Sequence, residues 1–336
     1  MRSRGGDPDP APCRDDRPCF LITVDTEGDN AWARPREVET ENARHLPRFQ
    51  DLCEAFGLKP TYLTNHEMAV SPVFQEFGKG VLRRGTGEIG MHLHAWDSPP
   101  AHALTADDRE QHPYLIEYPE EVMRQKVAFM TDLLERTFEV KMVSHRAGRW
   151  SFDERYARIL LEHGYRVDCS VTPHISWRRH EGDLRPAGSD YTAYPEEAYF
   201  VDLNDLSRPG DSDLLEVPMT IWLDRGFVAR AVKPRFREGT LPRRALERFF
   251  PARTWLRPRG RDLARMAGVL TAVRREGRRY AEFMVHSSEL MPGGSPAFPT
   301  PASVDRLYDE LGRLFALAAR HFRGATLSEF RQWLRR

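Results

Sequence analysis

The sequence predicts a parallel α/β fold, and three observations support this class. Short apolar runs of strand length alternate with longer segments of helical period from Cys19 to the C-terminus, which is the order typical of parallel α/β proteins. The 336 residues are enough for one barrel-sized domain or two smaller ones. Polar residues suited to chemistry follow several apolar runs, and ligands in such folds bind at the carboxyl ends of the strands.

The apolar runs predict strands, in chain order, at Cys19–Val24, Pro60–Leu63, Glu88–Leu93, Lys141–Ser144, Tyr199–Leu203, Leu214–Pro218 and Ala281–Val285. The segments between them predict helices at Glu41–Phe56, Glu120–Phe138, Phe152–His163, Asp262–Arg275 and Val304–Phe322. Two pairs resemble capping boxes, in which an N-cap hydroxyl is followed three residues later by a glutamate. These pairs are Ser151 with Glu154 and Thr326 with Glu329. We therefore expect helices to begin at Ser151 and at Thr326.

The N-terminal stretch Met1–Pro18 is rich in Arg, Asp, Pro and Gly and lacks the apolar core of a secretory signal. We expect a disordered leader, followed by one barrel domain over residues 19–336. No later segment has the roughly 18 uninterrupted apolar residues of a membrane span. We therefore expect a cytoplasmic protein without a transmembrane segment, and leave peripheral membrane contact open.

Composition narrows the classes of partner. Fifty basic and 50 acidic residues give a formal net charge of +0, which argues against a nucleic-acid partner bound through a globally basic surface. The cysteines have no paired metal spacing, so neither a disulfide framework nor a zinc knuckle is expected. They are Cys13, Cys19, Cys53 and Cys169.

The span 225–279 is crowded with arginine around aromatic residues such as Phe249, Phe250 and Trp255. We interpret this span as an insertion or sub-domain. One interpretation of its charge is a solvated helical face with ordinary core aromatics. The other is a basic surface that grips the phosphate groups of a nucleotide sugar or lipid carrier, or an anionic bilayer.

The most informative motif is the pair His92 and His94, which closes the apolar run that begins at Glu88. Side chains alternate with period two in a strand, so both imidazoles share a face and can bind one divalent cation. Asp25 and Glu27 follow the first predicted strand and alternate in the same way. Glu27, His92 and His94 would leave an open position on the ion. We expect Zn²⁺ ahead of Co²⁺, Ni²⁺ or Mn²⁺.

The remaining candidates serve proton transfer. A bound metal ion lowers the pKa of its water from 15.7 to about 7, and Asp25 could accept the proton of that water. Arg146 is the candidate to keep Asp25 ionised and oriented. His286 follows the last predicted strand, and imidazole has an unperturbed pKa suited to protonating a leaving amine. Acid and imidazole groups at three strand ends therefore suggest a metal hydrolase.

Each candidate also has a structural alternative. A histidine after a strand is more often a hydrogen-bonded structural residue, but a pair on one strand face with acids nearby is less often so. Asp25 and Glu27 also suit a turn or a helix cap, and His286 could cap the segment after it. Among the other histidines, His145 is the strongest candidate for a further role.

Five segments resemble the motifs of the polysaccharide deacetylases of carbohydrate esterase family 4, which include chitooligosaccharide deacetylases of the nodulation type. They are Val24–Glu27, Glu88–His92, His145–Ser151, Gly164–Ser170 and Val285–Leu290. The resemblance runs from Cys19 to the C-terminus, is weakest in the arginine-rich span, and looks closest to a branch found with bacterial O-antigen and capsule biosynthesis genes. It implies an irregular (β/α)7 barrel of the polysaccharide deacetylase type and dependence on a divalent metal ion.

The resemblance also implies a role for individual residues. They are Asp25 as catalytic base, Arg146 as the residue that holds this base, His286 as general acid, and Glu27 and His92 as metal ligands. The family's second metal histidine commonly lies four residues after the first, where this chain has Trp96. His94 would have to take that place. Glu27 also stands where many members have a second, adjacent aspartate.

Five residues are expected to contact the substrate. Trp96, Trp150 and Trp222 are candidates for stacking on sugar faces, with core packing as the alternative for each. Arg149 lies in the third motif, and Asp168 lies in the segment that resembles a wall of the substrate groove.

These features predict a metal-dependent deacetylase that removes an N-acetyl or other small acyl group from a sugar in bacterial surface-polysaccharide synthesis. The sugar could be free, nucleotide-linked or lipid-linked. Three alternatives remain open. The first is a cyclic imidase or amidase of the same superfamily, and the second is a glycosidase that pairs Asp25 or Glu27 with Glu289. The third is an inactive sugar-binding homologue, suggested by Trp96 at the position of the family's second metal histidine.

Overall fold

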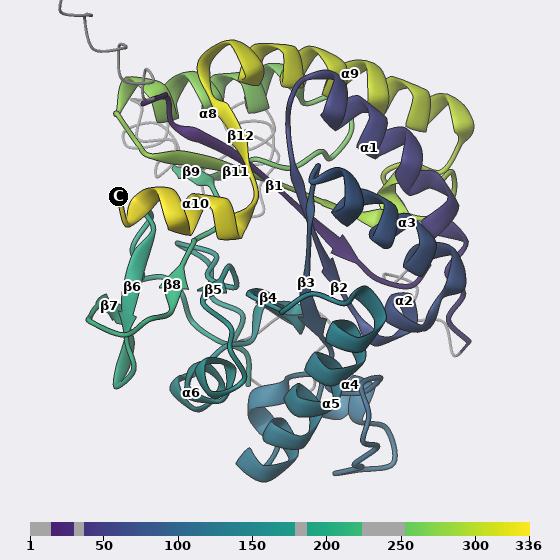
Figure 1. Cartoon of the computed structure of the whole chain (residues 1–336), viewed down its shortest axis with the longest axis vertical. Helices are drawn as coiled ribbons and strands as arrows, with labels where there is room; N and C mark the ends of the chain where they lie inside the picture. Colours follow the sequence, from purple (N-terminus) through teal and green to yellow (C-terminus); the bar gives the residue numbers. More distant parts are fainter. Residues whose placement is uncertain (1–14, 30–36, 179–186, 224–252) are drawn as a thin grey trace, which may run out of the picture.

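The structure of the protein is a computed structural model that describes residues 15–29, 37–178, 187–223 and 253–336 (Figure 1). Residues 1–14 of the expected leader lie outside the described residues, and so do residues 225–252 of the expected arginine-rich insertion. In the described part, helices surround a set of central strands (Figure 1).

The described strands form a curled, mixed sheet of ten strands. Nine follow one another in the order β11 (Tyr280–His286), β1 (Cys19–Thr26), β2 (Pro60–Thr64), β3 (Glu88–Leu93), β4 (Ser144–Ala147), β5 (Val167–Asp168), β8 (Leu215–Glu216), β6 (Tyr199–Asp202) and β7 (Asp205–Pro209). From β11 to β8 all neighbours are parallel, whereas β6 and β7 pair antiparallel. The short strand β12 (Arg323–Ala325) also pairs with β1, in parallel. The parallel α/β prediction is thus confirmed for the main part of the sheet.

No strand pairing between β8 and β11 closes the sheet within the described residues. The space between them is spanned by Leu256, which follows the antiparallel pair of β9 (Ile221–Leu223) and β10 (Arg253–Trp255). The Leu256 N–H donates to Thr220 O at 3.0 Å, and its carbonyl accepts from Met284 N at 3.1 Å. The fold is therefore an α/β half-barrel, and the described strands do not close into the expected (β/α)7 barrel.

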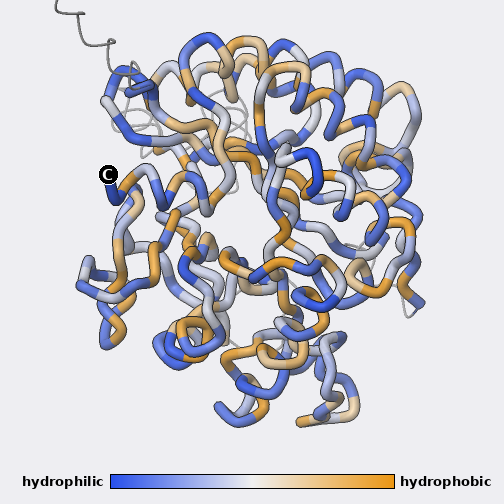
Figure 2. The backbone as a smooth tube through the Cα atoms, in the orientation of Figure 1, coloured by the Kyte–Doolittle hydropathy of each residue, from blue (hydrophilic) through white to orange (hydrophobic). Residues whose placement is uncertain are grey.

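The helices of the described residues lie mostly outside the curled sheet, and the last of them covers its amino end (Figure 1). They are α1 (Leu46–Ala55), α2 (His66–Val70), α3 (Pro72–Arg84), α4 (Asp108–Gln111), α5 (Glu120–Phe138), α6 (Glu154–Glu162), α8 (Leu263–Arg275), α9 (Pro301–His321) and α10 (Leu327–Leu334). The described part of the chain also contains four 3-10 turns, η2 (Glu41–His45), η3 (Leu115–Glu117), η4 (Gly148–Trp150) and η7 (Ser287–Leu290). Figure 2 shows hydrophobic stretches in the central strands and hydrophilic turns on the outer helices.

Alternation along β1 divides the apolar side chains into two clusters. Phe20, Ile22 and Val24 pack with the residues of the surrounding helices. Cys19 and Leu21 belong to a separate inner cluster that includes residues of α10. Side chains that continue the odd-numbered series of β1 therefore point to the inside of the half-barrel.

The inner space is covered at the amino ends of the strands. The backbone N–H of Leu327 donates to Thr61 Oγ1 at 3.2 Å, and that of Ser328 donates to Glu88 Oε2 at 3.0 Å. Because Thr61 and Glu88 lie at the beginnings of β2 and β3, α10 occupies this end. The polar residues that follow the strands lie at the opposite end.

Several element boundaries match the sequence prediction and others do not. β3 and α5 have the predicted bounds, and the capping box of Thr326 with Glu329 is confirmed. The prediction for the fourth strand was wrong, because β4 begins at Ser144, where the predicted strand ended. β4 carries buried polar side chains that have buried partners, so it lacks the apolar signature of a strand.

Two further predictions about helices are corrected. The predicted helix Glu41–Phe56 is divided into η2 and α1. Ser151 is not the cap of α6, because the Asp153 side chain accepts from Tyr156 N and fills that role. A carboxylate serves the N-cap as well as a hydroxyl does. The helix α3 was not predicted.

Neither a membrane-spanning helix nor a disulfide framework was expected, and only the described residues bear on these two points. None of the described helices combines the length and the apolar character that crossing a bilayer requires. Cys19, Cys53 and Cys169 are free and buried in this part of the chain, and Cys13 lies outside it.

Candidate metal centre and active site

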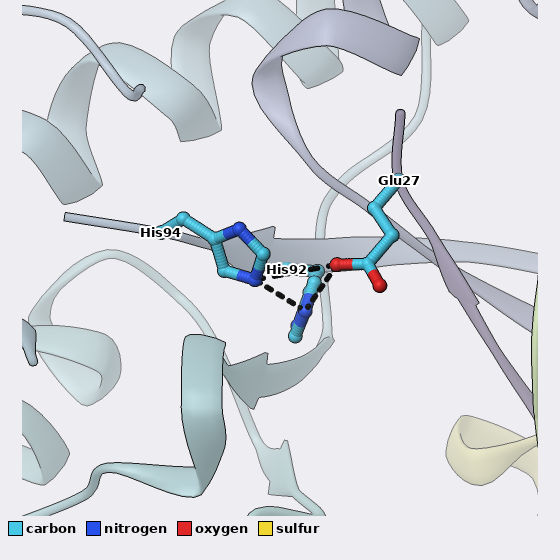
Figure 3. A group of neighbouring side chains, drawn as sticks. All are labelled: Glu27, His92 and His94. Atoms are coloured by element: carbon cyan, nitrogen blue, oxygen red, sulfur yellow. Dashed lines mark hydrogen bonds and ion pairs between the residues drawn. The ribbon is translucent and has the colours of Figure 1, made fainter. Parts of the chain in front are cut away.

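Glu27, His92 and His94 converge at the carboxyl ends of β1 and β3 (Figure 3). The two Nε2 atoms of His92 and His94 are 3.0 Å apart. Glu27 Oε2 lies 3.7 Å from His92 Nε2 and 3.4 Å from His94 Nε2. All three side chains are buried. The three ligand atoms thus face one common point.

This arrangement fits a divalent cation such as Zn²⁺. Donor atoms about 2.0–2.1 Å from a tetrahedral ion lie roughly 3.3 Å from one another, which is close to the spacings of Glu27, His92 and His94. His92 Nδ1 lies 3.0 Å from Arg146 O, so Nδ1 carries the proton and Nε2 keeps its lone pair toward the common point. Two imidazoles and one carboxylate are the donors that Zn²⁺ prefers, and they leave a fourth position open.

Opposite charges in this cluster outweigh the effect of burial on the pKa values of Glu27 and His92. Burial alone would raise the pKa of Glu27, but the hydrogen bond and charge of His92 and the charges of His286 and His94 hold this pKa below its ordinary value. Burial opposes the charged form of His92, yet Asp25 and Glu27 raise the pKa of His92. The cluster therefore holds an ionised carboxylate beside the two rings.

Asp25 lies next to this cluster and is paired with Arg146 inside the half-barrel. Arg146 Nη1 donates to Asp25 Oδ1 at 2.5 Å, and the Arg146 side chain is fully buried. Burial raises the pKa of Asp25, but Arg146, His92 and His286 outweigh this effect and lower the pKa to about 2. Asp25 is therefore ionised at neutral pH and can accept a proton.

Arg146 also binds a second acid, Glu282, which the sequence analysis missed. Arg146 Nη2 donates to Glu282 Oε1 and, at 3.0 Å, to Thr23 Oγ1, while Nε donates to Cys169 O at 3.1 Å. Burial raises the pKa of Glu282 to about 7. The signal was present, because Glu282 interrupts an apolar strand on the same face as His286.

His286 faces the two acids from β11. Its Nε2 lies 3.8 Å from Asp25 Oδ2 and 3.5 Å from Glu27 Oε1. Strand register explains this approach, since Asp25 is paired with His286 in the parallel ladder of β1 and β11. Burial lowers the pKa of His286, but Glu289 and Glu27 raise it above its ordinary value overall. His286 can therefore carry a proton beside an ionised Asp25.

Arg257 and Glu289 form a second ion pair, which lies on the Nδ1 side of the His286 ring. Glu289 Oε2 accepts from His286 N at 2.9 Å and lies 3.3 Å from His286 Nδ1. Arg257 Nη2 donates to Glu289 Oε1 at 3.0 Å and lies 3.4 Å from His286 Nδ1. Burial would raise the pKa of Glu289, but Arg257 and His286 lower it to about 2. Neither contact with His286 was predicted from the sequence.

Two of the expected substrate residues adjoin these groups. The Arg146 guanidinium lies 4.8 Å from the centroid of the Trp150 ring, and Trp96 lies 4.5 Å from the ring of His94. Trp150 also meets Trp177 and Trp255, with ring centroids 6.5 and 6.0 Å away. All four tryptophans are half-buried. Three of them, Trp150, Trp177 and Trp255, form an aromatic wall that borders the candidate site.

Arg149 and Trp150 have unusual backbone conformations. Their φ angles are 54° and 60°, in the left-handed region that residues other than glycine rarely adopt. Such strain is concentrated at functional sites. The Arg149 guanidinium lies 5.4 Å from the ring of Tyr114. Of these two residues, Trp150 borders the candidate site through its contact with Arg146, and Arg149 contacts Tyr114.

Asp168 does not line a groove in this structure, which corrects the prediction. Its side chain is fully buried, and its Oδ1 lies 2.6 Å from His145 Nδ1. His145 Nε2 lies 2.8 Å from the hydroxyl of Tyr156 in α6. Val167 and Cys169, on either side of Asp168, belong to the inner cluster, so alternation turns Asp168 outward. His145 and Asp168 therefore join the sheet to α6.

Trp222 is also turned away from the aromatic wall. In the antiparallel pair of β9 and β10, Trp222 is paired with Thr254, whereas Trp255 is paired with Ile221. Neighbouring pairs of an antiparallel ladder point to opposite faces. The ring of Trp222 lies instead 5.0 Å from the guanidinium of Arg278. Trp222 therefore does not belong to the aromatic wall, and its stacking on a sugar stays a prediction.

Comparison with known proteins supports the fold. No protein-family model and no curated protein matches the sequence. Among solved structures, a provisionally assigned polysaccharide deacetylase from Mycobacterium smegmatis matches with a TM-score of 0.52 and 16% identity, over 99% of this chain and 94% of that chain. This protein therefore shares the fold of a polysaccharide deacetylase.

Weaker likenesses reach two further structures. The carbohydrate esterase family 4 domain of a multidomain xylanase, from the hindgut metagenome of Trinervitermes trinervoides, matches with a TM-score of 0.44 and 9% identity, over 95% of this chain and 91% of that chain. A 4-alpha-glucanotransferase from Thermococcus litoralis matches with a TM-score of 0.49 and 12% identity, over 94% of this chain and 38% of that chain. Evidence for a reaction comes from the residues of the candidate site.

Proposed function

We propose that this protein is a metal-dependent deacetylase that removes an N-acetyl or other small acyl group from a sugar. The observation that carries the proposal is the combination of two neighbouring sets of groups. Glu27, His92 and His94 share one point suited to a divalent cation, and an Arg146-bound Asp25 lies beside this cluster and His286. A hydrolysis that needs both a base and an acid uses such a pair.

In the proposed reaction, each residue of the chain has one task. A divalent cation at Glu27, His92 and His94 would supply Lewis acidity and make water more acidic. Asp25 accepts the proton of the attacking water, and Arg146 keeps Asp25 ionised and fixed in orientation. His286 donates a proton to the nitrogen that leaves, so that the sugar departs as a neutral amine.

The surroundings of Glu289 argue against the glycosidase alternative. A glycosidase needs one carboxylic acid with a raised pKa as proton donor. Arg257 and His286 instead hold the pKa of Glu289 at about 2, and its two oxygens are occupied by His286 N and Arg257 Nη2. This carboxylate is therefore a poor proton donor, and the deacetylase proposal is the better supported of the two.

A sugar as substrate is supported by the aromatic wall of Trp150, Trp177 and Trp255 beside Arg146. Half-buried tryptophan rings combine a flat apolar surface with a polar edge, as sugar faces require. We further propose that the sugar is nucleotide- or lipid-linked and serves surface-polysaccharide synthesis in the cytoplasm. The exposed Arg259, 5.9 Å from the Trp255 ring, is a candidate to contact a phosphate of such a carrier.

The first experiment measures metal and turnover together. We expect near-stoichiometric metal in the purified wild type by mass spectrometry, and its loss in His92→Ala and in His94→Ala. The exposed His102→Ala serves as the matched control. We also expect acetate release from N-acetylated sugars that stops on chelation and in Asp25→Asn.

The alternatives predict different results. Sugar-bond cleavage that survives chelation would identify a glycosidase, and metal binding without any turnover across acylated sugars would identify an inactive homologue. Hydrolysis of small cyclic amides in preference to acylated sugars would identify an imidase. The phosphate contact is tested with Arg259→Gln and Arg261→Gln together, while Arg257 is left in place because it binds Glu289. An unchanged KM for a phosphorylated acyl sugar would contradict it.

A further inference from the structure

His94 differs from His92 in the way it is held. His92 lies within β3, whereas β3 ends at Leu93, so the strand ladder does not fix the ring of His94. His92 Nδ1 also has a backbone partner at Arg146 O. The position of the His94 ring must therefore depend on side chains and loops around it.

Gly148 provides the space that the ring occupies. A Cβ atom at position 148 would lie 2.1 Å from His94 Cδ2 and 2.5 Å from Leu93 O. Both distances are far below van der Waals contact, and the second involves backbone that cannot move easily. Gly148 directly follows β4, the strand that carries Arg146. Any side chain at this position would displace the His94 ring.

Trp96 and Asp97 confine the other sides of the same ring. The Trp96 and His94 ring centroids are 4.5 Å apart, with planes inclined by 33°. Asp97 Oδ2 lies 3.6 Å from His94 Nδ1, the nitrogen opposite the one that faces Glu27. This oxygen is buried and has no hydrogen-bond partner, whereas Oδ1 accepts from Ser98 Oγ at 3.0 Å.

The loop that carries these residues is itself fixed. Ser98 N donates to His94 O at 3.3 Å, which closes a turn around Trp96 and Asp97. The buried Lys126 of α5 donates through Nζ to Ser98 O and, at 2.8 Å, to Pro100 O. Trp96 and Asp97 therefore have a fixed scaffold from which to act on His94.

We propose that Gly148, Trp96 and Asp97 are positioning residues that orient His94 as the second imidazole ligand of the metal. The proposal rests on the metal site proposed above. It explains how a histidine two residues after His92 can act beside it: the glycine admits the ring, the tryptophan supports its face, and the carboxylate directs its second nitrogen. Such partners of a metal-bound histidine commonly contribute a factor of 10 to 100 in metal affinity.

The test is the zinc affinity of the full chain, measured by competition with a chromophoric chelator. We expect Gly148→Ala to bind zinc about 10- to 100-fold more weakly than the wild type, and its Co²⁺ absorption spectrum to change shape or intensity. Gly268→Ala is the matched control, because no atom outside the adjoining backbone of α8 lies within 4 Å of a Cβ at that position. Gly148→Ala with the affinity and spectrum of the wild type would overturn the proposal.

Asp97→Ala and Trp96→Leu cover the case in which Gly148→Ala fails to fold. We expect both to retain the circular dichroism of the wild type and to bind zinc more weakly, with Asp97→Asn intermediate. Wild-type zinc affinity in both Asp97→Ala and Trp96→Leu would overturn the proposal. Failure of the metal site itself looks different: the wild type would then bind no zinc, or His94→Ala would bind it as tightly as the wild type does.

Discussion

Asp25 and His286 occupy paired positions in the parallel ladder of β1 and β11, and Asp25 Oδ2 lies 3.8 Å from His286 Nε2. Each has a separate ionic partner, Arg146 for Asp25 and Glu289 for His286. The pKa of Asp25 is lowered to about 2, and that of His286 is raised. Two adjacent groups with opposite shifts can act as base and acid at the same pH.

The first prediction concerns His286 as proton donor. His286→Ala should lower kcat by a factor of about 10² to 10⁴ and change KM little. Asp25 is active when ionised, above pH about 2, and His286 is active when protonated. Wild-type kcat should therefore fall as the pH rises through the elevated pKa of His286, and His286→Ala should lack this alkaline decline. An identical pH profile in the variant would contradict the assignment.

The second prediction concerns Arg146, which lies between two buried acids. Arg146→Met leaves Asp25 and Glu282 without their cationic partner, and removing one partner of a buried pair costs about 3–5 kcal/mol. Urea unfolding at pH 7 should show a loss of this size. Adding Glu282→Gln should recover part of it, because one uncompensated carboxylate is gone. A loss under about 1 kcal/mol would show that the pair contributes little.

The third prediction is a pH dependence of stability that comes from Glu289. Its pKa is lowered from 4.5 to about 2 on folding, so its ionised form contributes stability that is complete above pH 4.5 and lost as the pH falls toward 2. Glu289→Gln should be about 3 kcal/mol less stable at pH 7 and should approach the wild type near pH 2. Urea unfolding at both pH values tests this, with the exposed Asp309→Asn as control.

The fourth prediction links metal binding to stability. Zinc at 100 times its Kd should raise the free energy of unfolding by about 2.7 kcal/mol, if the unfolded chain does not bind it. Thermal unfolding with and without zinc measures this gain. His92→Ala should lose most of it, and the exposed His102→Ala should keep it. Equal stabilisation of His92→Ala would place the zinc elsewhere on the protein.

Local sequence patterns were sufficient to predict a strand or a helix where the segment has the same environment along its whole length. β3 and α5 match their predicted bounds, because an apolar run or a helical period is visible in a short window. Alternation in a strand also predicted that His92 and His94 share a face, although β3 ends at Leu93 and the side chains around His94 complete its approach to His92. β4 escaped prediction because three of its four buried residues are polar, and two of their partners, Asp168 and Asp25, lie more than 20 positions away.

Composition and periodicity are local properties, and they were enough to predict the α/β class and the residues able to serve as ligand, base and acid. Which of these residues meet depends on the way the chain folds. The register of β1 and β11 brings Asp25 to His286, while alternation on β5 and on β9 turns Asp168 and Trp222 away. Side-chain neighbours depend on how strands are paired and curled, and a one-residue change of register would send each side chain to the other face.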